Sequence, residues 1–79
     1  MRIIYFAHAR RATGCPLEDF YLTAPLSAPA LWDLLVERHP ALAPLRSVSR
    51  LARDEDFLPA DALLAPTDEI VVIPPVSGG

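Results

Sequence analysis

The chain has 79 residues and a mass of 8.6 kDa, which is enough for one small domain but not for two. Hydrophobic residues make up 52% of it and charged residues 22%, which excludes a disordered chain, and no apolar run approaches the length of a bilayer span. The formal net charge of −3 argues against a general binder of nucleic acids or anionic membranes.

Two strands joined by a loop are predicted at the N-terminus. Residues 2–8 concentrate isoleucine, tyrosine and phenylalanine, which favour strands. Residues 10–16 follow as a loop that contains Gly14 and Pro16. Apolar and acidic side chains alternate in residues 17–23. This pattern predicts a second strand and therefore an N-terminal β-hairpin.

A helix is predicted over residues 28–38, where apolar side chains recur at the helical period. Ser27 precedes this helix as an N-cap, and Pro29 falls in its first turn, where proline is tolerated. Pro40 ends the helix, because a proline disfavours helical geometry at the preceding residue, His39.

The remaining residues are predicted to form short elements and one strong strand. In chain order, the short elements are a helical turn at 41–46, a strand at 47–52, a polar turn at 53–56, a return strand at 57–58 and a turn at 63–64. Residues 69–73 form the clearest strand, because four consecutive residues from Ile70 are β-branched. Pro74 and Pro75 then stop that strand.

This element order predicts an α+β fold. Two strands, a helix and then two or three strands fit a mixed sheet of four to five strands with one main helix packed across it. The ubiquitin-like β-grasp is the smallest familiar architecture with this order. We therefore expect a β-grasp domain at residues 1–75 and an extended, flexible C-terminal tail at residues 76–79.

The first and last strands are apolar on both faces, whereas a single helix can cover only one face of a small sheet. The second face is expected to carry Phe6, Phe57, Val71 and Ile73. A contiguous apolar patch is seldom left bare, so these side chains predict a surface for a partner protein. The alternative is that loops cover this face or that both strands are simply buried.

The chain ends in two of its three glycines, Gly78 and Gly79. Because glycine has no Cβ, such a tail can enter a channel too narrow for side chains. Its reactive group is the α-carboxylate of Gly79, a poor electrophile that must be activated, most simply by adenylation with ATP. Pro74 and Pro75 fix φ and lack N–H donors, so they are expected to direct the tail out of the sheet.

Three segments together resemble the small, MoaD-type subunits of molybdopterin synthase, which are ubiquitin-like sulfur carriers. They are residues 2–10, the Ser27-capped helix and residues 68–79, so the resemblance covers essentially the whole chain. Its most specific element is the ending Pro74-Pro75-Val76-Ser77-Gly78-Gly79. One departure is visible, because members of the family often carry an asparagine near Arg53, where this chain has acidic residues.

The resemblance implies a non-catalytic sulfur-donor subunit with no active site and no bound cofactor of its own. A MoeB-type, ATP-dependent adenylyltransferase would adenylate Gly79, and a sulfur donor protein would convert it to a thiocarboxylate. The tail would enter the large, MoaE-type synthase subunit of a heterotetramer and donate sulfur to cyclic pyranopterin monophosphate, in molybdenum cofactor biosynthesis. Pro74, Pro75, Val76 and Ser77 would join the partner interface.

Three alternatives stay open. The first is a carrier of the same build that serves thiamine, cysteine or tRNA thiolation. The second is a ubiquitin-like modifier that is conjugated to lysines of target proteins. The third is an interaction domain in which the terminal diglycine has no chemical role.

Other candidate residues carry weaker signals. Cys15 has no base beside it in the sequence, and a single cysteine predicts a reducing, cytoplasmic setting. His8 and His39 lie far apart and lack a ligand-spaced cluster of Cys, Asp or Glu, so no metal site is expected. No nucleic acid or membrane is expected as a partner.

Overall fold

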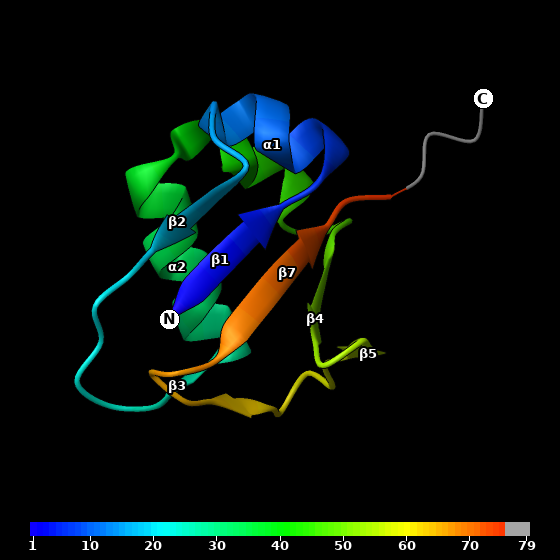
Figure 1. The fold of residues 1–79 in the computed structure, drawn as a ribbon. Helices are drawn as coiled ribbons and strands as arrows, with labels where there is room; N and C mark the ends of the chain where they lie inside the picture. The colour runs from blue at the N-terminus through cyan, green and yellow to red at the C-terminus, as the bar shows by residue number, and fades with distance from the viewer. Residues whose placement is uncertain (76–79) are drawn as a thin grey trace.

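Five strands form the main sheet of the computed structural model, which describes residues 1–75 (Figure 1). Their order across the sheet is β2-β1-β7-β4-β5, with bounds β2 Leu17–Asp19, β1 Arg2–Tyr5, β7 Glu69–Ile73, β4 Arg50–Arg53 and β5 Asp56–Phe57. The central pair, β1 and β7, is parallel, and all other pairs are antiparallel. A second, two-stranded sheet joins β3 (Leu26–Ser27) to β6 (Leu63–Leu64). The predicted mixed sheet is confirmed.

The main helix, α2 (Ala28–Arg38), has the predicted bounds. The Ser27 side chain caps it by accepting a hydrogen bond from the Ala30 N–H at 3.2 Å. After His39 the chain continues into a short 3₁₀ helix, η1 (Pro40–Leu45), which begins one residue before the predicted helical turn. None of the helices within residues 1–75 is long and apolar enough to cross a bilayer.

The N-terminal prediction was wrong between residues 7 and 13. The structure ends β1 at Tyr5 and forms a helix, α1 (Ala7–Thr13), in place of the expected strand end and loop. The segment is rich in alanine and arginine, which are strong helix formers, and it turns sharply out of β1 at Ala7, where φ is 47°. Gly14 ends α1 with a left-handed φ of 75°. β1 and β2 still pair antiparallel, but a helix connects them.

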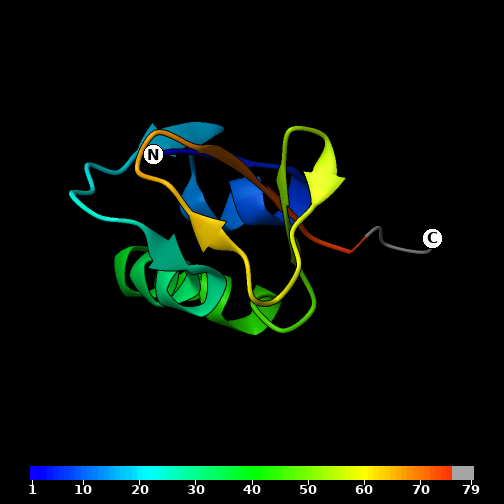
Figure 2. The same cartoon turned by 90° about the horizontal axis from the view of Figure 1, so that it is seen from below.

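The core lies between α2 and one face of the sheet (Figure 2). Along β1 and β7 every second side chain is fully or almost fully buried against the helix: Ile3, Tyr5, Ile70 and Val72. From α2, Leu31 and Leu35 fill the same layer. Because one helix covers one face, the intervening side chains of β1 and β7 remain on the opposite face, which carries no helix.

The two leucines of β6 provide a test of this core. Leu64 is fully buried, whereas its neighbour Leu63 is 65% exposed. We expect Leu64→Ala to lower the free energy of unfolding by about 2–5 kcal/mol, because it leaves a cavity. Leu63→Ala should change it by less than about 0.5 kcal/mol. Urea denaturation measures both values, and equal losses for the two variants would contradict the described core.

Candidate functional site

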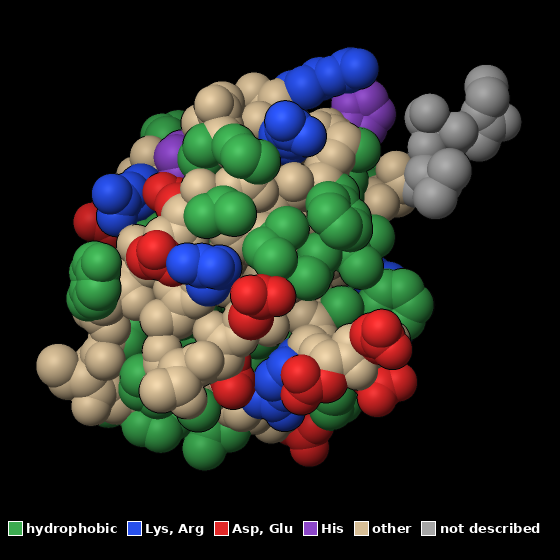
Figure 3. Space-filling model, in the orientation of Figure 1, with side chains coloured by type: hydrophobic (Ala, Val, Ile, Leu, Met, Phe, Trp, Pro, Cys, Tyr) green, Lys and Arg blue, Asp and Glu red, His purple; other side chains and the backbone are tan. Residues whose placement is uncertain are grey.

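An unbroken row of apolar side chains crosses the open face of the sheet. The strand registers align Leu17, Ile4, Val71, Ala52 and Phe57, one from each of the five strands. Residues paired directly across strands project to the same face, so the row is continuous. Its two ends, Leu17 and Phe57, are exposed. Figure 3 shows this face, with hydrophobic side chains gathered around the end of β7.

A groove of about 360 Å³ lies on this face, at the end of the row occupied by Phe57. Phe6, Phe57, Val71 and Ile73, which the sequence predicted on a single open face, all line it. The remaining lining residues are Ala52, Asp54, Glu55 and Glu69. Phe6 and Phe57 are each about half exposed. The structure thus brings the four predicted side chains together, while their role in binding a partner stays a prediction.

Arg50 holds the Phe57 ring at the edge of the groove. Its guanidinium carbon lies 3.6 Å from the ring centroid, which is a close cation–π contact. Arg50 also pairs with Ile73 across β4 and β7, so its position is set by the sheet. An aromatic side chain fixed in this way offers apolar contact area with little loss of side-chain entropy on binding.

The rim of the groove is acidic and strained. Asp54 and Glu55 form the turn between β4 and β5, with φ of 53° and 70°. Such a turn normally takes Asn-Gly, because two consecutive positive φ values are costly for other residues. Within residues 1–75 the ion pairs use other carboxylates; Arg53, for example, binds Asp68 at 2.8 Å. Together with Glu69, three carboxylates without an ion pair among residues 1–75 therefore line the apolar groove.

The chain leaves the sheet at the apolar end of this face. β7 ends at Ile73, Pro74 is buried and Pro75 is exposed. The last backbone hydrogen bond near this exit is donated by the Phe6 N–H to the Val72 carbonyl, at 3.3 Å. The described chain then points away from the body of the domain (Figures 1 and 2). Val76, Ser77, Gly78 and Gly79 lie outside the described residues, so the predictions about their roles stay predictions.

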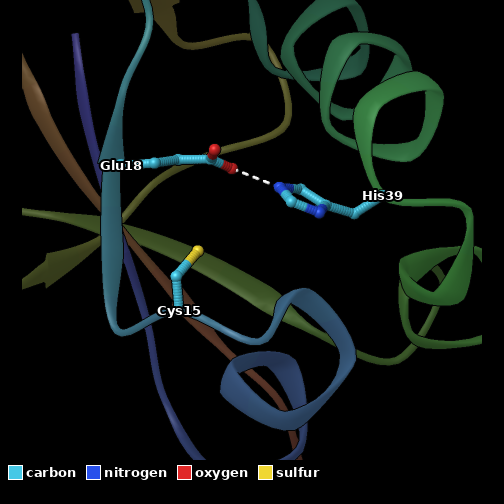
Figure 4. Close-up of side chains that lie close together, drawn as sticks. All are labelled: Cys15, Glu18 and His39. Carbon is cyan, nitrogen blue, oxygen red and sulfur yellow. Dashed lines mark hydrogen bonds and ion pairs between the residues drawn. The ribbon is translucent and has the colours of Figure 1, made fainter.

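A second polar cluster, centred on Glu18, lies at the β2 edge of the sheet (Figure 4). Glu18 Oε1 accepts a hydrogen bond from the Tyr5 hydroxyl and lies 2.5 Å from His39 Nε2, and Arg38 approaches Oε2 at 3.4 Å. Burial and the bond to Glu18 raise the pKa of the Tyr5 hydroxyl above its ordinary value. Cys15 Sγ lies within 4.8 Å of the Glu18 and His39 ligand atoms.

The sequence shows no ligand-spaced cluster around His39, yet the fold brings Cys15 and Glu18 beside it. The sequence separates His39 from Glu18 by the whole of α2 and the segment before it, so residue spacing gives no signal for the cluster. The contact between Glu18 and His39 depends on the pairing of β2 with β1 and on the position of the end of α2 beside β2. Glu18 is followed by a second acidic residue, Asp19, so its immediate sequence neighbours do not mark it as the sheltered carboxylate of the two.

Comparisons with known proteins agree with the fold and cover the whole chain. The model of the ThiS family matches residues 3–79. The human molybdopterin synthase sulfur carrier subunit is 37% identical over 82 residues, covering all of this chain and 93% of the human protein. The Arabidopsis thaliana molybdopterin synthase sulfur carrier subunit is 33% identical, covering all of this chain and 82% of the plant protein.

Solved structures agree with the predicted ubiquitin-like β-grasp. The crystal structure of small archaeal modifier protein 1 from Haloferax volcanii superposes with a TM-score of 0.84 at 24% identity, covering all of this chain and 98% of that one. The protein of the same name from Methanosarcina acetivorans gives a TM-score of 0.73 at 23% identity. At these identities the likeness shows the fold alone.

The acidic turn yields a test of the strain at the groove. Replacing Asp54-Glu55 with Asn-Gly should raise the free energy of unfolding by about 1 kcal/mol, because non-glycine residues at positive φ cost of order 1–3 kcal/mol each. Asp61→Asn, which removes an exposed carboxylate elsewhere, should change it by less than about 0.5 kcal/mol. Chemical denaturation compares the two variants, and an unchanged or lower stability of the Asn-Gly variant would contradict the strain.

Proposed function

The chain belongs to the ThiS family, and from that premise we propose that it is the sulfur-carrier subunit of a molybdopterin synthase. The observation that carries the proposal is its whole-length similarity to molybdopterin synthase sulfur carrier subunits, at 37% and 33% identity. Two features of the chain support it: the terminal Gly78-Gly79 and an apolar groove beside the exit of the C-terminal segment. The single free cysteine fits a reducing compartment, so we place the protein in the cytoplasm.

The chemistry begins at the carboxylate of Gly79. One carboxylate oxygen attacks the α-phosphorus of ATP on a MoeB-type adenylyltransferase, and pyrophosphate leaves. A sulfur donor protein then supplies sulfur at the sulfide level (HS⁻), which attacks the acyl carbon; AMP leaves, and the product is a thiocarboxylate. Because Gly78 and Gly79 have no Cβ, they can extend into a narrow active site where side chains would clash. There the thiocarboxylate sulfur attacks cyclic pyranopterin monophosphate, and water hydrolyses the resulting thioester, so that the sulfur stays on the pterin and the Gly79 carboxylate is restored.

The large, MoaE-type synthase subunit is the partner proposed for the open face. Phe6, Phe57, Val71 and Ile73 line one groove at the end of the sheet from which the C-terminal segment leaves. A partner that covers this groove would hold the start of the tail, at Pro74 and Pro75, against its own surface. Proline fixes φ, so fewer backbone conformations are lost when the tail is inserted.

The carboxylates at the rim predict the charge of that partner surface. Asp54 and Glu55 flank the groove without an ion pair inside residues 1–75. Opposite charges across an interface steer association and fix its register. The surface that meets this groove should therefore be apolar at its centre and basic at its edge.

Mass analysis of protein isolated from its native cell tests the sulfur chemistry. We expect a fraction in which one oxygen of the terminal carboxylate has been replaced by sulfur. Deleting Gly79 should abolish sulfur transfer, because it removes the residue that carries the sulfur. It should leave the melting temperature unchanged, because the buried core is built from side chains between Ile3 and Val72. Covalent adducts to other proteins in place of the thiocarboxylate would favour the ubiquitin-like modifier. Full transfer activity without Gly79 would overturn the proposal.

The docking surface is tested by two exposed aromatic residues at opposite edges of the sheet. Phe57 on β5 is 50% exposed in the groove, and Tyr21 beyond β2 is 95% exposed. Phe57→Ala should weaken binding to the large subunit by about tenfold or more, because truncating an aromatic side chain that anchors an interface typically costs about 2 kcal/mol or more. Tyr21→Ala should leave the affinity unchanged. Isothermal titration calorimetry measures both, and equal affinities would place the interface elsewhere.

A further inference from the structure

We propose that Cys15, Glu18 and His39 form a binding site for a divalent cation of the zinc class (Figure 4). A sulfur, a carboxylate oxygen and an imidazole nitrogen from these residues all lie within 4.8 Å of one another. Thiolate, carboxylate and imidazole are the ligand types that zinc accepts in proteins. A thiolate ligand disfavours the hard cations Mg²⁺ and Ca²⁺, which take oxygen ligands. The donor set therefore selects zinc or a similar borderline metal.

The backbone of each proposed ligand residue is already held in place by the fold. The chain reaches Cys15 through the left-handed turn at Gly14, and the Thr13 hydroxyl accepts the Cys15 N–H at 3.3 Å and donates to the Cys15 carbonyl at 3.0 Å. Glu18 is the middle residue of β2. His39 directly follows α2, and its N–H donates to the Leu35 carbonyl at 2.8 Å. Little backbone order would be lost on binding a cation, because these three positions are set beforehand.

An outer shell of side chains orients the ligands. The Tyr5 hydroxyl donates to Glu18 Oε1, the Arg38 guanidinium approaches Glu18 Oε2, and the Tyr5 ring meets the His39 ring edge-on with centroids 6.0 Å apart. Second-shell hydrogen bonds of this kind hold metal ligands in place. The Glu18 and His39 side chains are only 15% and 17% exposed, so the site is sheltered while both ligands keep some contact with solvent.

Cation binding is a small rearrangement of the contacts described above. His39 Nε2 and Glu18 Oε1 lie 2.5 Å apart in a hydrogen bond, and the cation would replace the proton between them. The Cys15 thiol would release its proton to water, and the remaining imidazole proton would reside on Nδ1. Ligand atoms around a tetrahedral zinc stand about 3.4–3.8 Å apart. The Glu18–His39 pair must therefore open by about 1 Å, and Cys15 must move inward, both by side-chain rotation. Three protein ligands leave a fourth position for water.

This site is separate from the groove on the open face. It lies at the β2 edge of the sheet, whereas the groove lies toward the β5 edge, with β1, β7 and β4 between the two edges. A cation there would connect the loop after α1, strand β2 and the end of α2. We therefore expect it to stabilise the fold and to leave the tail chemistry unaffected.

Metal titration of the full chain tests the proposal. Calorimetry and native mass spectrometry should show one zinc ion per chain, and zinc should raise the melting temperature. Cobalt in place of zinc should give a thiolate-to-metal charge-transfer band. Cys15→Ser and His39→Gln should weaken zinc binding by about 100-fold or more, since losing even a residue that only orients a ligand costs about 10–100-fold. His8→Gln, a change to the one other histidine, should bind zinc like the unaltered chain.

Two results would overturn the proposal. One is the absence of stoichiometric zinc binding by the reduced, folded chain. The other is zinc binding that survives Cys15→Ser with no cobalt–thiolate band in the unaltered chain, which would place the metal at other residues. If His39→Gln fails to fold because Glu18 loses its partner, Cys15→Ser decides, since the hydrogen bonds of Cys15 come from its backbone.

Discussion

The structure depends on the parallel pairing of β1 with β7, which joins the beginning of the described chain to its end. Parallel strands cannot be joined by a tight turn, so the connection between them must cross over one face of the sheet, and α2 makes that crossing. The pairing puts Ile3 beside Ile70 under the helix and Ile4 beside Val71 on the other side. One ladder thus creates both the buried core and the open apolar face. Both the core and the open face require β7, the last strand in the chain, because it is the central strand of the sheet.

Local patterns in the sequence were enough for the parts of the fold that local interactions decide. The bounds of α2 follow from the Ser27 cap and Pro40, and the strand at residues 69–73 follows from its β-branched run. Phe6 misled the prediction of the first strand, because its aromatic side chain continues the strand pattern while the backbone already turns into α1. Val71 and Ile73 of the groove were predictable, because alternation along β7 identifies the face on which they lie.

The cluster at the other edge was not predictable, and the reason is physical. Its members, Cys15, Glu18 and His39, come from a loop, a short strand and the end of a helix. Their contact depends on tertiary packing, which produces no helix-like or strand-like periodicity of residues in the sequence. The Glu18 carboxylate is sheltered at low cost only because Tyr5, Arg38 and His39 surround it. The two edges of the sheet therefore differ in kind, with an apolar groove beside β5 and a polar network beside β2.

The β1–β7 ladder also determines how the domain responds to a mechanical load. Its backbone bonds run from the Arg2 N–H, bound to the Asp68 carbonyl, to the Phe6 N–H, bound to the Val72 carbonyl. The chain enters the ladder at one end of β1 and leaves β7 at the opposite end (Figure 1). Tension between these two points is directed along the strands and loads the whole ladder in shear, so that its bonds must break together. Force applied to the segment after Pro75, with the N-terminus held, would therefore have to break the β1–β7 hydrogen bonds together and not one after another.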